Sequence, residues 1–266
     1  MRELTKCWLA LAVLGLTSMP AQAEEEPLLE DPVGLIGATP TPFGGATLTL
    51  AGAYQRARSG PNRDTWAGGL ETELGLLRGA DLRFQQAVAW GDAAPRPADP
   101  AQRVWGGATQ IGLRWQFLEE NGPWPALGVF GAVFTTYGET SRPSEGASVT
   151  GLLTRTLVDG PRPLALYLNA GVVGLLDPQP GERPARYQFA AGLAHSLAQD
   201  TSIAISASLD QQGRGERDET LVIGGIWHRL GGSGPILSLA AGAGIGRDSP
   251  SFVIGAAMKW VFGGTD

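Results

Sequence analysis

The side chains of this 266-residue chain that could carry out chemistry are few and scattered. There are two histidines, His195 and His228, and a single cysteine, Cys7. A catalytic serine needs a histidine within hydrogen-bond reach, and a metal site needs several ligands held together. Ser196 directly follows His195, so the two would lie on opposite faces of a strand. The sequence therefore argues against an enzyme and against a metal or cofactor site.

A second group of polar residues recurs at alternate positions of strand-like segments, which places them on one face. If that face encloses a lumen, two interpretations stay open. The residues form either a polar conduit whose charges select solutes, or a lattice of ion pairs and amides that fills a narrow barrel. The predicted lumen-lining residues, beside Tyr167 and Gln188, are Glu71, Glu73, Arg83, Gln85, Gln110, Arg114, Asn169, Arg186, Asp210 and Lys259.

One ion pair is expected across a short turn at residues 78–80. If this turn places Leu77 opposite Asp81, Glu73 lies opposite Gln85 and diagonal to Arg83. The carboxylate of Glu73 would then be within reach of the Arg83 guanidinium. We expect a salt bridge between them.

The elements that position these residues are strands with one apolar face. In the last segment the apolar face ends in aromatic residues, whereas Gly255, Ala257 and Lys259 fall on the other face. From residue 46 onward, turn signals separate twelve such segments. The fifth and tenth are apolar on both faces, so the sequence does not show which of their faces points inward. The twelve segments are 46–58, 65–77, 81–91, 103–118, 125–138, 147–158, 164–176, 185–197, 201–211, 219–230, 235–246 and 251–262.

The apolar faces of these strands point to a lipid environment. A soluble β-sandwich or lipocalin-like barrel, the alternative, hides its apolar face and shows abundant charge. Here only 17% of residues are charged, 39 are glycines, and tryptophans fall near strand ends. Short turns alternate with longer loops, which is typical of outer-membrane barrels whose two ends lie in the periplasm. The sequence predicts an all-β, antiparallel up-and-down transmembrane barrel in a Gram-negative outer membrane.

The chain divides into four parts. Residues 1–23 are typical of a signal peptide: Arg2 and Lys6 precede a short apolar run, and a small-residue cleavage site ends at Ala23. Residues 24–45 are predicted to be an irregular periplasmic lead-in, too short for a folded plug domain. Residues 46–262 would form the barrel and residues 263–266 a tail. We expect the barrel-assembly machinery to recognise the last strand, which ends at Phe262.

The charge of the chain bears on its partners. The formal net charge is −6, and removing the leader, with Arg2 and Lys6 against Glu3, leaves −7. An acidic chain without a basic stripe argues against nucleic acid as a partner. The expected partners are outer-membrane lipid and small-molecule solutes.

Two stretches resemble the outer-membrane barrels known as phenol-degradation proteins of the MetA pathway, or simply as transporters. One runs from Gly107 to Val129 (GATQIGLRWQFLEENGPWPALGV); the other is the closing pattern of glycines, Ser249-Pro250 and a terminal aromatic residue. The chain departs from the family at Ala108, where an aspartate is expected, and has Thr136-Tyr137-Gly138 where the family has Pro-Thr-Gly. The resemblance implies a barrel that moves aromatic or other hydrophobic small molecules.

Taken together, the sequence predicts a passive channel or transporter for small solutes. One alternative is a closed barrel with a structural or surface-interaction role. A further alternative is an outer-membrane lipolytic enzyme, which would need a serine and a histidine presented together.

Overall fold

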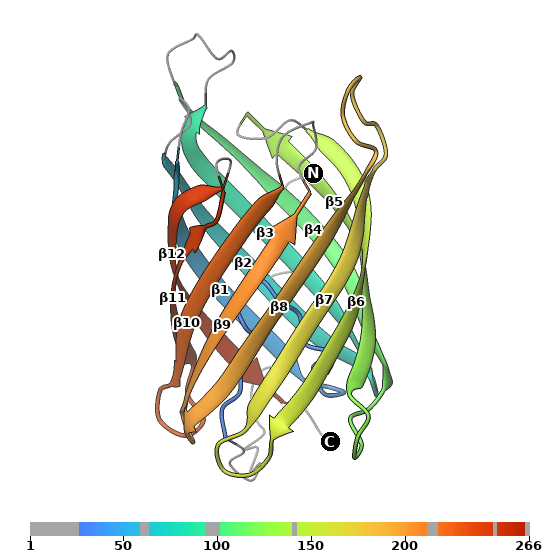
Figure 1. Cartoon of the computed structure of the whole chain (residues 1–266), viewed down its shortest axis with the longest axis vertical. Coiled ribbons are helices and arrows are strands. Elements are labelled where there is room, and N and C mark those ends of the chain that lie inside the picture. Colours follow the sequence, from blue (N-terminus) through green and yellow to red (C-terminus); the bar gives the residue numbers. More distant parts are fainter. Residues whose placement is uncertain are drawn as a thin grey trace, which may run out of the picture.

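The alternating segments close on themselves into a twelve-stranded antiparallel barrel in the computed structural model of the chain (Figure 1). The structure describes residues 27–58, 64–93, 102–139, 143–211, 218–246 and 249–263. Each strand pairs with its sequence neighbours, and the first and last strands close the ring with Ala46 opposite Phe262. The predicted all-β, up-and-down barrel is confirmed. The expected signal peptide and residues 264–266 of the expected tail lie outside the described residues.

The strands begin and end within three residues of the predicted boundaries, the largest difference being at Ser144. No helix long enough and apolar enough to cross a membrane occurs in the described part of the chain. The strands are β1 (Ala46–Ala57), β2 (Asp64–Leu77), β3 (Ala80–Ala93), β4 (Gln102–Leu118), β5 (Ala126–Gly138), β6 (Ser144–Val158), β7 (Leu164–Leu175), β8 (Ala185–Ala198), β9 (Thr201–Asp210), β10 (Glu219–Arg229), β11 (Ile236–Gly244) and β12 (Pro250–Phe262).

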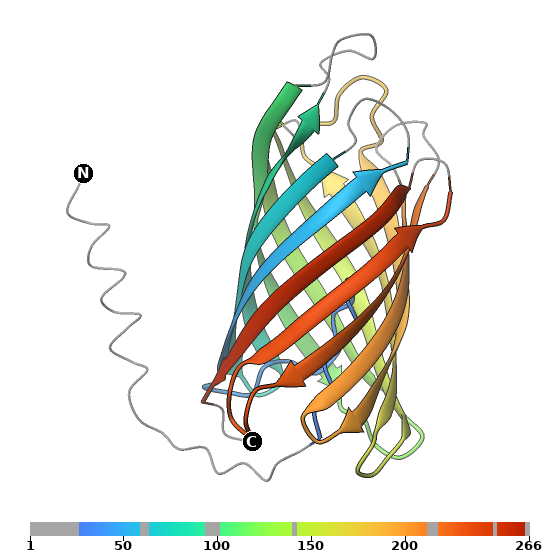
Figure 2. The ribbon, with the colours of Figure 1, turned by 90° about the vertical axis from the view of Figure 1, so that its left-hand side faces the viewer.

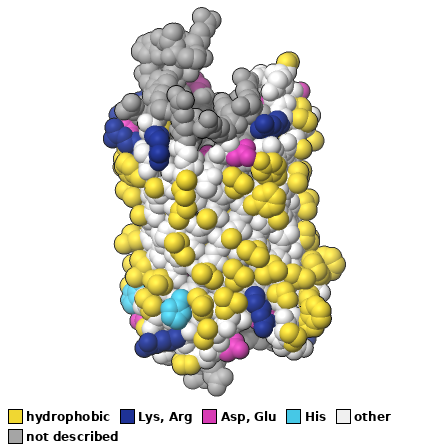
Figure 3. All heavy atoms as spheres, in the orientation of Figure 1, with side chains coloured by type: hydrophobic (Ala, Val, Ile, Leu, Met, Phe, Trp, Pro, Cys, Tyr) yellow, Lys and Arg dark blue, Asp and Glu magenta, His cyan; other side chains and the backbone are white. Residues whose placement is uncertain are grey.

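The outside of the barrel is apolar. Large side chains such as Trp115, Val133 and Leu239 expose half or more of their surface on the outer wall. Hydrophobic side chains are spread over the visible wall between its two ends, and charged ones gather toward these ends (Figure 3). Ring closure pairs the backbone groups of every strand, as a structure in hydrocarbon requires. The wall therefore suits contact with lipid.

The two ends of the barrel differ in their connections. Two residues join β2 to β3 and two join β8 to β9, and the first of these turns uses Gly79 at φ 78°. These turns lie at the same end as the first residue of β1 and the last of β12 (Figures 1 and 2). Short turns and both barrel termini face the periplasm in outer-membrane barrels. We call this the periplasmic end.

Residues 27–43, here called the plug segment, lie inside the periplasmic half of the barrel (Figure 2). They are irregular, as expected of the lead-in, but they enter the lumen instead of lying outside it. The molecule's core is where this segment meets the wall, and the plug contributes Leu28, Leu35 and Ala38 to three buried clusters. Burial of these apolar side chains favours insertion, because outside the lumen water would surround them.

The plug segment explains why β5 and β10 are apolar on both faces, which prevented the sequence from showing their inward face. On β5 the inward Phe130 packs in the cluster with Ala38, and on β10 the inward Trp227 packs with Leu28. Both strands are apolar on both faces because one face meets lipid and the other meets the plug.

The wall is thinned by glycine where the plug approaches it. A Cβ atom at Gly75 of β2 would lie 1.9 Å from the carbonyl oxygen of Pro42. A Cβ at Gly192 of β8 would lie 3.0 Å from the Cβ and Cγ atoms of Pro32. Glycine at these positions permits the close approach.

Candidate functional site

Charged side chains of β2 and β3 meet inside the barrel. Arg83 donates from Nε to Oε1 of Glu73 at 2.8 Å and from Nη2 to Oε1 of Glu71 at 3.0 Å. Gln85 also donates to Glu71. Charge-assisted bonds of this kind hold the carboxylates in a fixed arrangement. The network gives one side of the lumen a polar wall with largely compensated charge.

The predicted salt bridge between Glu73 and Arg83 is present, but the predicted register was wrong by two residues. Glu73 lies directly opposite Arg83, and Gln85 lies opposite Glu71. The difference arises because the turn is shorter than expected and the pairing shifts between Gly75 and Leu77. The bulge and the turn at Gly79 together move β3 along β2.

Arg114 of β4 extends this network to the plug segment. Its Nε lies 3.2 and 3.1 Å from the carboxylate oxygens of Asp81, and its Nη1 donates to the carbonyl of Gly37 at 3.2 Å. Asp81 also accepts the backbone N–H of Thr41 at 2.7 Å, and the Thr41 hydroxyl donates to Glu73 at 2.9 Å. The buried charges are therefore paired, and their pairing fixes the end of the plug to the wall.

The opposite side of the wall holds the plug mainly by backbone groups and apolar contacts. In the orientation that satisfies both groups, the Asn169 amide nitrogen donates to the carbonyl of Ile36 at 3.0 Å, and the amide oxygen accepts from the N–H of Ile36 at 2.9 Å. The Ser206 hydroxyl donates to the carbonyl of Val33 at 2.7 Å. These contacts, with the buried clusters, anchor the middle of the plug to β7 and β9.

The plug segment divides the lumen into two cavities. The larger, about 720 Å³, lies on the extracellular side of the plug, and the smaller, about 410 Å³, lies on the periplasmic side. The lining of the larger cavity is mixed: Arg83 and Gln110 lie on β3 and β4, and the apolar side chains Phe134, Val173 and Trp227 lie on β5, β7 and β10. Four residues line both cavities: Glu30, Asp31, Glu73 and Lys259.

The structure places the predicted lumen residues in four groups. Arg114 lines the smaller cavity, and Asn169 holds the plug. Arg186 and Asp210 are half-buried and are not among the residues that line the two cavities. The larger cavity is lined by Glu71, Glu73, Arg83, Gln85, Gln110 and Lys259, together with Gln188.

Sequence reasoning missed the lumen residues of the plug and the carboxylate at the turn. These are Glu30, Asp31, Thr41 and Asp81. The signal that could have found the first three is the run of apolar residues between 28 and 36, which is unusual for a segment exposed to water. Asp81 stands at the start of β3 on the same face as Arg83, but only the register of β3 against β4 places it opposite Arg114.

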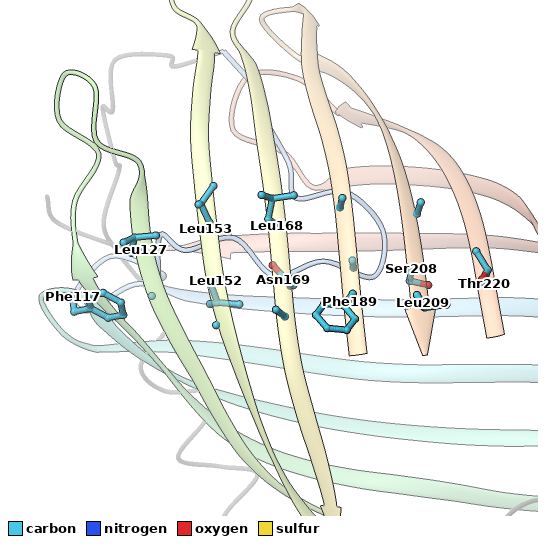
Figure 4. Close-up of a pocket in the computed structure, with 16 residues that line it drawn as sticks. Phe117, Leu127, Leu152, Leu153, Leu168, Asn169, Phe189, Ser208, Leu209 and Thr220 are labelled. Carbon is cyan, nitrogen blue, oxygen red and sulfur yellow. The ribbon is translucent and has the colours of Figure 1, made fainter. Parts of the chain in front are cut away.

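A third hollow lies on the lipid side of the wall and is separate from the lumen (Figure 4). It has a volume of about 680 Å³ and crosses from β4 to β10, with Leu127, Leu153, Leu168 and Phe189 around it. Leu168 and Phe189 are exposed on the outer wall. An apolar groove in this position suits lipid acyl chains.

The two histidines stand apart from the lumen network. His195 and Ser196 are on opposite faces of β8: Nδ1 of His195 lies 3.2 Å from the carbonyl of Pro163, and the fully buried Ser196 donates to the carbonyl of Ala198. Within the described ranges, no three His, Cys, Asp or Glu residues are grouped so that they could hold a metal ion.

Comparisons with known proteins bear on the fold. No family model matches the chain, and no curated protein matches it. An outer-membrane channel from Pseudomonas putida F1 is similar in structure, with a TM-score of 0.63 at 13% identity, over 88% of this chain and 100% of that one. A KdgM porin is similar with a TM-score of 0.54 at 9% identity, over 82% of this chain and 99% of that one. The resemblance to the phenol-degradation family is not confirmed by these comparisons. The chain is a transmembrane β-barrel of the outer-membrane type.

Proposed function

We propose that this barrel is an outer-membrane channel through which small solutes pass down their gradient, favouring solutes with an aromatic or other apolar body and a polar group. The larger cavity carries the proposal, because the polar side chains Arg83, Gln85 and Gln110 and the aromatic side chains Phe134 and Trp227 line the same space. A solute with an apolar body and a polar group can contact both kinds of side chain at once. The resemblance to the phenol-degradation family agrees with an aromatic solute.

The transport mechanism is diffusion through a lumen whose charges are already paired. Because Glu73 is compensated by Arg83 and Arg114, this wall can form hydrogen bonds without trapping a counter-ion tightly. Binding weak enough for release is what conduction requires. Export through residues 1–23 and assembly through the strand that ends at Phe262 belong to this proposal.

A closed barrel with a structural or surface role is the second candidate, and the plug segment favours it. The plug narrows the periplasmic half of the lumen and is bound on several sides. If the native lumen is sealed, replacing Arg83 and Arg114 by serine should create a conductance that the parent lacks.

The test is solute flux into proteoliposomes that contain the mature chain. We expect a benzyl-bearing quaternary ammonium ion to enter faster than an aliphatic quaternary ammonium ion of similar size, because only the first offers an aromatic body to Phe134 and Trp227. Protein-free liposomes are the control, since permanent cations cross bilayers poorly. Entry of neither ion through a folded barrel would refute the channel, and equal entry would refute the aromatic preference. An esterase assay on the same protein tests the lipolytic alternative, and we expect no activity.

A further inference from the structure

A solute that crosses this lumen has to pass the plug, and the two cavities indicate where. They share four lining residues: Glu30 and Asp31 on the plug, Glu73 on β2 and Lys259 on β12. We call these four residues the junction. Both cavities reach the junction, so it is where the separation between them is thinnest.

The attachment of the plug differs around its circumference. Toward β5 to β11 it is held by the three buried clusters and by bonds such as Ser206 to Val33. Toward β12, the contact is an ion pair, with Nζ of Lys259 2.7 Å from Oε2 of Glu30. The side chains of Lys259 and Glu30 are 29% and 14% exposed and border both cavities. Separating this ion pair costs less than exposing three apolar clusters, because water that enters the cavities can solvate the freed charges.

We propose that solutes cross the plug at the junction, and that the ion pair between Glu30 and Lys259 closes this route until it separates. This inference rests on the proposed channel function. The charges of the junction residues also determine which ions the route favours. Lys259 is the one cation among the four junction residues, and Glu73 is compensated by Arg83 and Arg114. Glu30 and Asp31 then outnumber Lys259, so the route favours cations.

The test is the current through single channels in planar bilayers, with a potassium chloride gradient to measure the ratio of K⁺ to Cl⁻ permeability. Lys259→Met and Glu30→Gln should both raise the conductance, because each breaks the same ion pair. Their selectivities should shift in opposite directions: the permeability ratio rises for Lys259→Met and falls for Glu30→Gln. A general loosening of the barrel would not produce shifts of opposite sign.

Two further variants complete the experiment. Arg56→Met is the matched control, because it also removes one cation from an ion pair, with Asp64 at 3.9 Å, and neither of these residues lines the two lumen cavities. It should leave conductance and selectivity unchanged. The exchanged pair Glu30→Lys with Lys259→Glu keeps the net charge and restores an ion pair, so its conductance should return toward that of the parent.

The outcomes separate the two proposals. If the parent conducts but Lys259→Met and Glu30→Gln behave like it, solutes cross elsewhere and the junction is refuted while the channel stands. If both variants shift selectivity in the same direction, the junction is likewise refuted. If the parent and all variants are folded, as judged by heat-dependent gel mobility, and none conducts, the channel itself fails, and the junction fails with it.

Discussion

Arg114 allows the strength of the internal network to be measured. Its side chain is only 4% exposed, and its main partner Asp81 is fully buried at 0%. Arg114→Met leaves that carboxylate without its cation and the carbonyl of Gly37 without its donor. Removing one partner of a buried ion pair costs about 3–5 kcal/mol. We expect a loss of stability of that size.

The second step of this prediction removes the matching charge. In the double variant Arg114→Met with Asp81→Asn no carboxylate is stranded at this site, and the asparagine oxygen can still accept the N–H of Thr41. The double variant should therefore be more stable than the sum of the two single effects predicts, by about 0.5–3 kcal/mol, the coupling typical of residues in one network.

The assay is reversible denaturant unfolding in lipid vesicles, followed by tryptophan fluorescence. Arg155→Met serves as the control, because its ion pair with Glu120 is partly exposed at 29% and 28%. Such a pair contributes about 0–1 kcal/mol. If Arg114→Met loses no more stability than Arg155→Met, or if the effects at 114 and 81 simply add, the reasoning about a buried coupled network is wrong.

Three further predictions concern the plug and the wall. Gly75→Ala would place a Cβ 1.9 Å from the carbonyl oxygen of Pro42, so it should displace the plug and cost about 1–3 kcal/mol, read out as faster proteolysis of the plug segment. Leu35→Ala removes a side chain that is 6% exposed and should weaken docking of the plug by about 2–5 kcal/mol; amide hydrogen exchange should speed up in the plug and not in the strands. Brominated acyl chains should quench the fluorescence of Trp115, which is 54% exposed on the outer wall, and should spare Trp227, which is 8% exposed inside, when each is the only tryptophan.

The strands could be predicted from sequence because lipid and lumen impose opposite demands on alternate residues. In the last strand Ile254 faces outward, whereas Lys259 faces inward and reaches Glu30. The same alternation placed Glu73 and Arg83 in the lumen. Alternation could not show which face of β5 and β10 points inward, because an inward residue such as Phe130 is apolar where it meets the plug.

Register and the plug depend on contacts that alternation does not encode. The pairing of Glu73 with Arg83 depends on a bulge beside Gly75, and one bulge changes the register of a whole strand pair. The position of the plug depends on contacts between residues far apart in sequence, such as the hydrogen bond from the N–H of Ala38 to the hydroxyl of Thr154 at 2.9 Å. A segment without regular structure carries no periodicity from which such contacts could be read.

The central claim is that solutes pass the plug inside the lumen. Its most direct test compares the single-channel conductance of the mature chain with that of a variant that lacks residues 24–40. The strand ladder is continuous without those residues, so both forms should fold as barrels. We predict a small, finite conductance for the native chain and a larger one for the shortened chain. If both forms fold and neither passes current, or if both pass equal currents, the claim is wrong.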